Sequence, residues 1–348
     1  MASKFALSQT AIKAWKDTPP NIWYKMYVTK ELPRPQSNAT KLGSYVHALI
    51  LSPNEVDEKF VVYDKDQPSD SIVKVFKRYL QLINNHNNRE LKEGEELKPL
   101  PYDLTNIDLL KKVCVEISYY KTQLDRAIKE LSKETAYFEF LVSTRGRTII
   151  TSAEVEDAKA LKEILLSDNM SKGFFVPKKN CEVLFEVKIE HDLELPMDFE
   201  LDFIPTKGYI DILHFNHKRE EVREVDLKIT DDAFNFHTVM RIFDYPSQHS
   251  FYDMLIREFL KVYQDGKYAH YTVMNPLNVV IDNDIRIPYI YEYNQNDLYI
   301  KRYGIENTNV KGWQDTVHEI AWHLEKGDWS RPKFHIENKK LLVNIFKR

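Results

Sequence analysis

The sequence predicts an α/β fold in which a central β-sheet is flanked by helices and the chain carries a helical insertion. Two observations predict this class. β-rich segments separated by turn residues follow one another from Cys181 to Thr230, and apolar residues recur every three or four positions in long segments before and after them. With 348 residues, of which 43% are hydrophobic and 29% charged, the chain can bury a sizeable core.

The N-terminal segments are predicted to be helical. A short helix begins near Ser8 and stops before Pro19 and Pro20, and an aromatic run follows it. In residues 42–51 apolar side chains return at helical spacing, with His47 near the middle. This spacing predicts a second helix that carries the histidine.

Residues 54–180 are predicted to be a mostly helical insertion within a single domain that spans residues 1–348. Apolar residues at helical spacing in 71–83 and 106–131 favour helices there. The polar stretch between them, residues 84–101, favours a loop. The insertion carries no motif that the sequence alone interprets.

Residues 181–330 are predicted to be the sheet-containing core. A capping box formed by Thr151 and Glu154 predicts a helix to about Ser167 shortly before this core. In chain order, the core is predicted to contain strands at 181–190, 199–204, 208–215 and 221–229, a helix at 244–263, strands at 268–276, 278–281 and 285–294, and a helix at 313–327.

Composition narrows the possible kinds of site. The formal net charge of -4 gives no bulk attraction for nucleic acid, although a locally basic channel is compatible with it. Only Cys114 and Cys181 are present, so a disulfide framework is not expected and a four-cysteine zinc or iron–sulfur site cannot form within one chain. No Walker-type glycine loop occurs, so ATP use is not expected.

Targeting signals are also absent from the printed sequence. The N-terminus lacks the apolar run of a signal peptide, and no stretch approaches the roughly 18 apolar residues of a membrane span. We therefore expect a cytoplasmic protein that does not enter a membrane.

Two strand-like segments each carry a carboxylate, and the second also carries a lysine. Asp211 lies in GYIDIL and Asp226 in VDLKIT, where Lys228 shares the face of Asp226 because strand side chains alternate. Carboxylate oxygens suit Mg²⁺ or Mn²⁺, which activate a bound water and stabilise charge on a scissile phosphate; a lysine adds positive charge there. The alternative is a solvated sheet edge with a weak exposed ion pair.

These segments resemble the D…(D/E)xK core of the PD-(D/E)XK nuclease superfamily. Downstream, Tyr245, Gln248 and Tyr252 share a helix face in DYPSQHSFYDML and resemble the Y-x-x-Q…Y helix of the RecB-type branch. Upstream, LGSYVHALILSP, with Gly43 and His47, resembles the first motif of that branch, and LSQTAIKAWKDTPPNIWYK resembles its opening segment. Over most of its length the chain is most similar to the exonuclease VIII group of phage and prophage recombination exonucleases.

The resemblance implies a central mixed sheet with the acid-bearing strands in its middle, and it assigns roles by position. Asp211 and Asp226 would hold the metal, with the Leu227 carbonyl as a candidate third ligand, and Lys228 would orient or activate water. The central acid is aspartate rather than the commoner glutamate, and KIT replaces the frequent KTT. Neither departure removes a ligand.

The same resemblance brings helix residues to the site. Gln248 would position the lysine, the water or DNA, and Tyr245 and Tyr252 would support it or touch the DNA. His47 would lie close to the metal, as a ligand or as a hydrogen-bond partner of a bound water. A lone histidine on an apolar helix is otherwise most often a core residue.

Several further residues compete for roles at this site. Glu186 is a candidate ligand for a second metal, and Glu182 competes with it because both lie on one strand face. Glu224 shares the face of the central acid, so a shifted alignment would use it instead. His214 and His217 form an H-x-x-H pattern that we discount, because they follow a strand into a turn where their side chains would not converge.

The function that the resemblance implies is Mg²⁺-dependent hydrolysis of linear double-stranded DNA by an exonuclease, with Mn²⁺ as a substitute and digestion from the 5′ end. It further implies a phage- or prophage-encoded protein of the bacterial cytoplasm, a homo-oligomeric ring and a single-strand annealing protein as partner. The alternatives are an endonuclease or single-strand nuclease of the same fold in repair or defence, and a non-catalytic DNA-binding module. The iron–sulfur form of CRISPR-adaptation nucleases needs four cysteines and is excluded.

Overall fold

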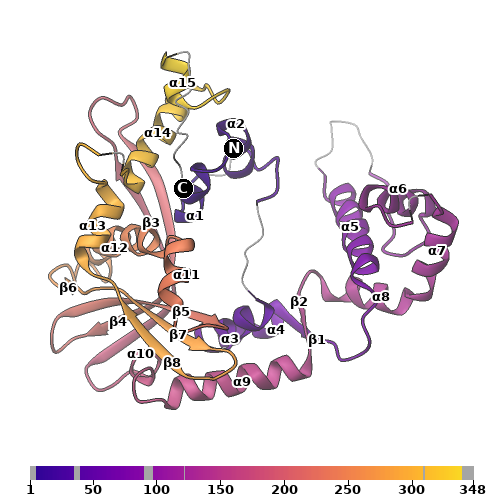
Figure 1. Cartoon of the computed structure of the whole chain (residues 1–348), viewed down its shortest axis with the longest axis horizontal. Helices are drawn as coiled ribbons and strands as arrows, with labels where there is room; N and C mark the ends of the chain where they lie inside the picture. The colour runs from indigo at the N-terminus through magenta and orange to yellow at the C-terminus, as the bar shows by residue number, and fades with distance from the viewer. Residues whose placement is uncertain (1–4, 35–39, 90–96, 121, 309, 339–348) are drawn as a thin grey trace. The chain divides into compact units, whose positions relative to one another are not determined.

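The chain divides into two compact units. The computed structural model describes residues 5–34, 40–89, 97–120, 122–308 and 310–338. The sheet-containing unit comprises Met1–Pro53 and Asp157–Arg348, and the helical unit comprises Asn54–Glu156 (Figure 1). None of the helices in the described ranges combines the length and the apolarity needed to cross a membrane.

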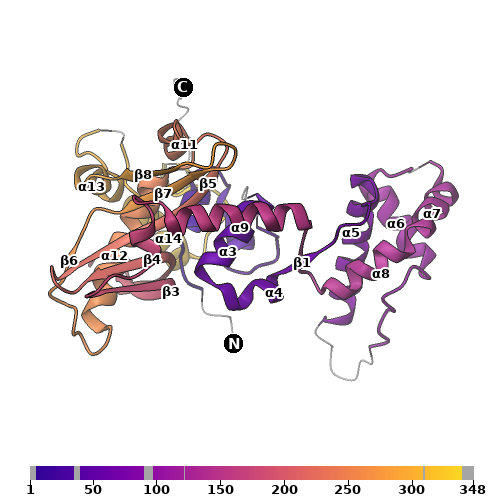
Figure 2. The ribbon, with the colours of Figure 1, turned by 90° about the horizontal axis from the view of Figure 1, so that it is seen from below.

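A six-stranded mixed sheet forms the centre of the sheet-containing unit. Its strands are β3 (Cys181–Glu194), β4 (Phe203–Asn216), β5 (Glu221–Thr230), β6 (Thr272–Val273), β7 (Leu277–Asp282) and β8 (Pro288–Glu292). The order is β3-β4-β5-β7-β8, with the short β6 paired to β5. Figure 2 shows the strands of this sheet from below. The β5–β7 and β5–β6 pairs are parallel and the others antiparallel. The predicted mixed α/β class with a central mixed sheet flanked by helices is confirmed.

Ten helices of the described residues belong to this unit. They are α1 (Gln9–Trp15), α2 (Pro20–Tyr27), α3 (Lys41–Leu51), α9 (Ser152–Ser167), α10 (Lys172–Phe175), α11 (Phe236–Ile242), α12 (Tyr245–Val262), α13 (Gln295–Tyr303), α14 (Trp313–Lys326) and α15 (Lys333–Asn338). α12 packs against β3 and β4, and its buried Phe251 and Leu255 share one apolar core with Ile210 and Leu213 of β4. This core fixes α12 beside the acid-bearing strands.

Helices also dominate the helical unit, as the sequence predicts for the insertion. Its elements are η1 (Pro53–Glu55), α4 (Val56–Lys59), β1 (Phe60–Val62), α5 (Asp70–Asn87), α6 (Ile107–Ile117), α7 (Leu124–Lys133), α8 (Thr135–Thr144) and β2 (Thr148–Ile150). Buried side chains of α5 to α8, such as Phe76, Leu110 and Phe138, form a core of their own. Part of the predicted loop at 84–101, residues 90–96, lies outside the described residues.

The boundary after this unit differs from the predicted one, because the unit ends at Glu156 and not at 180. The predicted capping box is confirmed: the Thr151 N–H donates to Glu154 Oε2 at 2.8 Å, and the Glu154 N–H to Thr151 Oγ1 at 3.2 Å. The helix that it starts, α9, continues into the sheet-containing unit, where Lys162 Nζ donates to the Leu49 carbonyl at 2.9 Å. Residues after 156 therefore pack with the sheet.

Two glycines let helices approach the central strands closely. A Cβ on Gly208 of β4 would lie 2.7 Å from Leu255 Cδ1 and 2.9 Å from Tyr252 Cε1, so the missing side chain makes room for α12. A Cβ on Gly43 would lie 2.9 Å from Thr40 Oγ1 and 3.8 Å from Ile229 Cβ, so α3 starts against β5. These contacts bring α12 and α3 to the same pair of strands.

Some sequence-predicted elements are wrong in extent. The segment 199–204 is not a separate strand: the Leu195 N–H donates to the Asp202 carbonyl at 2.9 Å, so residues between them turn the chain from β3 into β4. The strand predicted at 268–276 shrinks to β6, because residues before it form turns. The helices α11 and α13 were not predicted. Pro20 begins α2 as its first residue, a position that tolerates proline, instead of only ending α1.

Candidate active site

The two predicted acids lie where the central strands β4 and β5 separate. Their antiparallel ladder ends at the pair Ile212 and Val225, so Asp211 and Asp226 are the first residues beyond it. β4 continues beside β3, and β5 continues beside β7. In place of a further ladder bond, Asp211 Oδ2 accepts a hydrogen bond from the Leu227 N–H at 3.0 Å. The carboxylate of Asp211 therefore helps to hold the two strands at their point of separation.

Glu186 points into the same place because the β3–β4 ladder is interrupted there. The register pairs Phe185 with Ile212 and Val187 with Ile210, which leaves Glu186 and Asp211 unpaired. Glu186 has a φ of 50°, in the left-handed region that non-glycine residues rarely adopt. Such strain persists only where the surrounding structure enforces it and is common at functional sites.

His47 lies between two of the carboxylates. Its Nε2 is 2.9 Å from Asp211 Oδ2, and its Nδ1 is 3.2 Å from Glu186 Oε1. Burial lowers the pKa of His47, but hydrogen bonds and charge interactions with the two carboxylates outweigh burial and raise this pKa to about 10. The imidazole is therefore protonated at neutral pH and serves as the cation that pairs Glu186 with Asp211.

Lys228 neutralises the other acid. Its Nζ is 2.5 Å from Asp226 Oδ2, and it lies 5.2 Å from the centre of the Tyr245 ring, a cation–π contact. Burial lowers the pKa of Lys228, but the charges of Asp226 and Asp211 raise it above its ordinary value. The Asp226 side chain is 4% exposed, so the alternative of a solvated ion pair on a sheet edge is wrong.

The predicted helix residues of α12 also reach this cluster. Gln248 Nε2 donates to Asp226 Oδ1 at 3.1 Å, so Gln248 contacts the acid and not the lysine. Tyr252 lies against Gly208. Burial, followed by the charges of Asp211, Asp226 and two glutamates, raises the pKa of Tyr252 well above its ordinary value. Tyr252 is therefore a neutral phenol that faces the acids.

α3 and α12 approach the acids from opposite faces of β5. Gly43 of α3 lies near Ile229, whose side chain alternates with those of Asp226 and Lys228. Gln248 of α12 contacts Asp226 on the other face. The place where β4 and β5 separate is thus covered by one helix on each side, and His47 crosses to Asp211 from α3.

The structure distinguishes the competing glutamates. Glu186 reaches His47, whereas Glu182 lies 3.3 Å from His217 Nε2 at the end of the strands. Glu224 is buried and its Oε1 lies 2.7 Å from His249 Nδ1. Burial raises the pKa of Glu224 to about 7. Burial lowers the pKa of His249, but the charge of Glu224 and its hydrogen bond outweigh burial and raise this pKa above its ordinary value.

Neighbouring polar residues that sequence reasoning missed complete the cluster. Asn278 Nδ2 donates to Asp226 Oδ2 at 2.6 Å, and the Tyr293 hydroxyl donates to Asn278 Oδ1. Asn278 lies directly opposite Asp226 in the parallel β5–β7 ladder. A register between distant strands has no local sequence signal, so nothing in NVVI indicated this contact. The side chain of His214 lies near Phe174, and that of His217 lies near Tyr271.

The acids are neutralised by side chains of the chain itself. Within the described ranges, no group of three or more His, Cys, Asp or Glu residues is arranged to hold a metal ion. By chemistry, however, the donor set of Glu186, Asp211 and Asp226 is the kind that hard divalent cations prefer. The residue types therefore fit Mg²⁺, while His47 contacts one oxygen each of Glu186 and Asp211, and Lys228 contacts Asp226 Oδ2.

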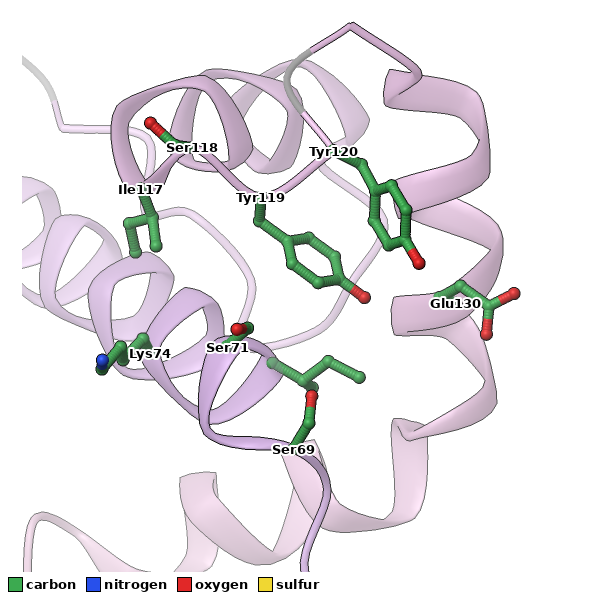
Figure 3. A pocket seen from close by; sticks show the side chains of 9 residues that line it. Ser69, Ser71, Lys74, Ile117, Ser118, Tyr119, Tyr120 and Glu130 are labelled. Carbon is green, nitrogen blue, oxygen red and sulfur yellow. The ribbon is translucent and has the colours of Figure 1, made fainter.

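A separate open pocket of about 580 Å³ lies in the helical unit (Figure 3). It is lined by Ser69, Ser71, Ile72, Lys74, Ile117, Ser118, Tyr119, Tyr120 and Glu130. In Figure 3 the rings of Tyr119 and Tyr120 extend toward the side of the pocket where Ser69 lies. Glu130 is the one carboxylate of this lining, and it lies 2.8 Å from Lys133. The pocket therefore lacks the grouped acids of the sheet-containing unit.

Comparison with known proteins does not assign the chain to a family. No protein-family model matches the sequence, and no curated protein is significantly similar to it. The function is therefore inferred from the quoted motifs and from the contacts of the residues that they contain.

Proposed function

We propose that this protein is a Mg²⁺-dependent nuclease with the PD-(D/E)XK fold, which hydrolyses phosphodiester bonds of DNA. One observation carries the proposal. Residues singled out from motifs far apart in the sequence come together where two central strands separate. His47 contacts Glu186 and Asp211, and Gln248 contacts Asp226. Asp211 accepts a hydrogen bond from the N–H of Leu227, the residue after Asp226. A chance likeness in sequence gives no reason for such convergence.

The charge of the cluster supports a divalent cation. Glu186, Asp211 and Asp226 supply three negative charges, and Lys228 and the protonated His47 supply two positive charges, so one negative charge remains. A cation that displaced the His47 proton would meet two negative charges. Asp211, Asp226, Glu186, His47 and the Leu227 carbonyl are the groups that would hold Mg²⁺, with Mn²⁺ as a substitute. Bound there, the cation would lower the pKa of a water and stabilise charge on the phosphate.

The chain's own residues supply the other requirements of hydrolysis. Lys228 keeps its proton and provides a positive charge beside the phosphate that becomes more negative in the transition state. Gln248 holds Asp226 by one oxygen, and Tyr245 supports Lys228 through its ring face. Tyr252 remains a neutral hydrogen-bond donor because of burial and the surrounding acids.

The substrate and the cellular role follow from the resemblance alone. It favours exonuclease action on linear double-stranded DNA from the 5′ end, by a ring of subunits in the bacterial cytoplasm that hands a single strand to an annealing protein. Phage or prophage recombination is the corresponding process. An endonuclease or single-strand nuclease in repair or defence would use the same acids, so end dependence has to be measured.

The test is digestion of a linear duplex labelled at its 5′ or its 3′ end, with Mg²⁺ or with EDTA, and with a circular duplex as the control for end dependence. Asp211→Ala removes a proposed metal ligand, and Lys228→Ala removes the group proposed to orient the attacking water. Lys188→Ala is the matched control, because Lys188 lies on β3 of the same sheet, pairs with Glu190 at 2.6 Å and is 48% exposed.

If the protein is the proposed exonuclease, the wild type and Lys188→Ala should release the 5′ label from linear DNA in the presence of the metal. Asp211→Ala and Lys228→Ala should not release it. Cleavage of the circle would replace exonuclease by endonuclease. If the wild type cleaves no DNA with either metal, the nuclease proposal is wrong, and a non-catalytic DNA-binding module or an RNA substrate takes its place.

A further inference from the structure

A buried polar network lies behind Asp226, on the side away from Glu186. Its members come from four places: Glu224 on β5, Asn278 on β7, Tyr293 after β8 and His249 on α12. All four are almost completely buried, with exposed fractions of 2%, 0%, 4% and 1%. Burying so many polar groups is costly unless each is hydrogen-bonded.

Each contact in the network leads toward Asp226. His249 Nδ1 lies 2.7 Å from Glu224 Oε1, and its Nε2 lies 3.4 Å from Asn278 Oδ1. The Tyr293 hydroxyl donates to the same Asn278 oxygen. Since that oxygen accepts from Tyr293, the amide presents its NH₂ group to Asp226 Oδ2, at 2.6 Å. The direction of the amide is thus set by its neighbours.

Asn278 is one of two buried polar residues of β7; the other is Asp282 at the end of the strand. β7 reads LNVVID, all six residues are buried, and Val279, Val280 and Ile281 are apolar. Position 278 is directly opposite Asp226 in the ladder, so backbone hydrogen bonds hold the two residues in register. An apolar residue here would leave the Tyr293 hydroxyl without this acceptor and would remove one of the donors to Asp226 Oδ2.

The two carboxylate oxygens of Asp226 have different partners. Oδ2 accepts from Asn278 and contacts Lys228, whereas Oδ1 accepts from Gln248. With Oδ2 held by two donors, rotation of the carboxylate is restricted, and Oδ1 keeps a lone pair for a cation.

We propose that Asn278 is a positioning residue, which fixes the orientation of the Asp226 carboxylate for cation binding and is itself held by Tyr293 and by the Glu224–His249 pair. This inference rests on the proposed function. Residues that hydrogen-bond to metal ligands typically change metal affinity or activity by about 10- to 100-fold when they are replaced.

The test uses the full chain and measures Mn²⁺ binding by calorimetry beside kcat and KM for duplex DNA. Asn278→Leu removes the amide at similar volume, and Tyr293→Phe removes the hydroxyl that orients it. Val279→Ala is the matched control, because Val279 is the next residue of β7, is 0% exposed and points to the opposite face. Val279→Ala lowers the thermal midpoint without removing any polar contact of the network.

The expected result is Mn²⁺ affinity and kcat lower by about 10-fold or more in Asn278→Leu, with a smaller loss in Tyr293→Phe, and an unchanged KM for DNA. Unchanged Mn²⁺ affinity and kcat in both variants would overturn the positioning role while leaving the nuclease proposal intact, and so would an equal loss in Val279→Ala. If Asn278→Leu does not fold, Tyr293→Phe decides the question alone. A wild type that neither binds Mn²⁺ nor cleaves DNA would overturn both proposals.

Discussion

The protonated His47 between Glu186 and Asp211 predicts a stability that depends on pH in the absence of divalent cations. The pKa of this imidazole rises from 6.5 in the unfolded chain to about 10 in the folded one. The folded state therefore binds the proton more tightly. The resulting stabilisation is complete below pH 6.5 and disappears as the pH rises through about 10.

The size of the effect follows from the same two pKa values. Each pH unit across which only the folded state keeps the proton contributes about 1.4 kcal/mol. Between pH 6 and pH 9 the wild type should accordingly lose about 3 kcal/mol of its free energy of unfolding through His47. His47→Gln keeps a polar side chain of similar size but cannot take up the proton, so its unfolding free energy should change by about 3 kcal/mol less over this range.

Urea unfolding in EDTA at the two pH values, followed by tryptophan fluorescence, measures this difference. All five tryptophans, at positions 15, 23, 313, 322 and 329, belong to the sheet-containing unit, so the signal reports on the unit that holds His47. His270→Gln is the control, because this side chain is 58% exposed and lies 3.7 Å from its acidic neighbour Glu220. Equal pH dependence in the wild type and in His47→Gln would refute the pairing of His47 with the two carboxylates.

Substitutions at three further positions, Gly208, Glu186 and Lys228, test other parts of the site by the same urea assay. Gly208→Val should lower the free energy of unfolding by about 1–3 kcal/mol, because the new side chain would collide with α12. Gly173→Ala is the control and should be nearly neutral, because its Cβ would lie 3.5 Å from the Nζ of a lysine. Equal stabilities of the two variants would contradict the close approach of α12 to Gly208. Glu186→Val should be less stable than Glu186→Asn by about 1–2 kcal/mol, because asparagine tolerates a φ of 50°, and the reverse order would argue against that conformation. Lys228→Met should lower the free energy of unfolding in EDTA by about 3 kcal/mol, because it removes the ammonium group that pairs with Asp226. Mg²⁺ should restore part of this free energy by binding to the folded state. No change in stability on addition of Mg²⁺ would count against a cation site.

Local sequence patterns were sufficient to predict the strand and the helices that carry the site residues. Alternating side chains in EVREVDLKI and helical spacing in SQHSFYDML correspond to β5 and α12, and the position of His47 on a helix is confirmed as α3. These patterns are strong because one face of each element is buried against the core. The hydrophobic pattern of α13 is weaker, because Leu298 is the one buried residue in its sequence QNDLYIKRY.

Contacts set by long-range register could not be predicted. The choice between Glu182 and Glu186 depends on the interruption of the β3–β4 ladder, where Glu186 turns into the left-handed region. Alternation alone gives both residues the same face. Asn278 and His249 likewise approach Asp226 and Glu224 only because β5, β7 and α12 meet in the folded chain. Sequence identifies such residues as polar and says nothing about their partners.

Several features of the candidate site lower the stability of the fold. A protein that needed only a stable sheet would gain nothing from a left-handed Glu186, from three carboxylates gathered between central strands, or from a buried asparagine in an apolar strand. Each feature costs free energy, and each is compensated by a residue brought from a distant element, such as His47 from α3. Apolar residues of similar volume would stabilise these positions as well or better. The concentration of such features around Asp211 and Asp226 is therefore best explained by a chemical task at this point, and the metal-dependent cleavage assay addresses that task directly.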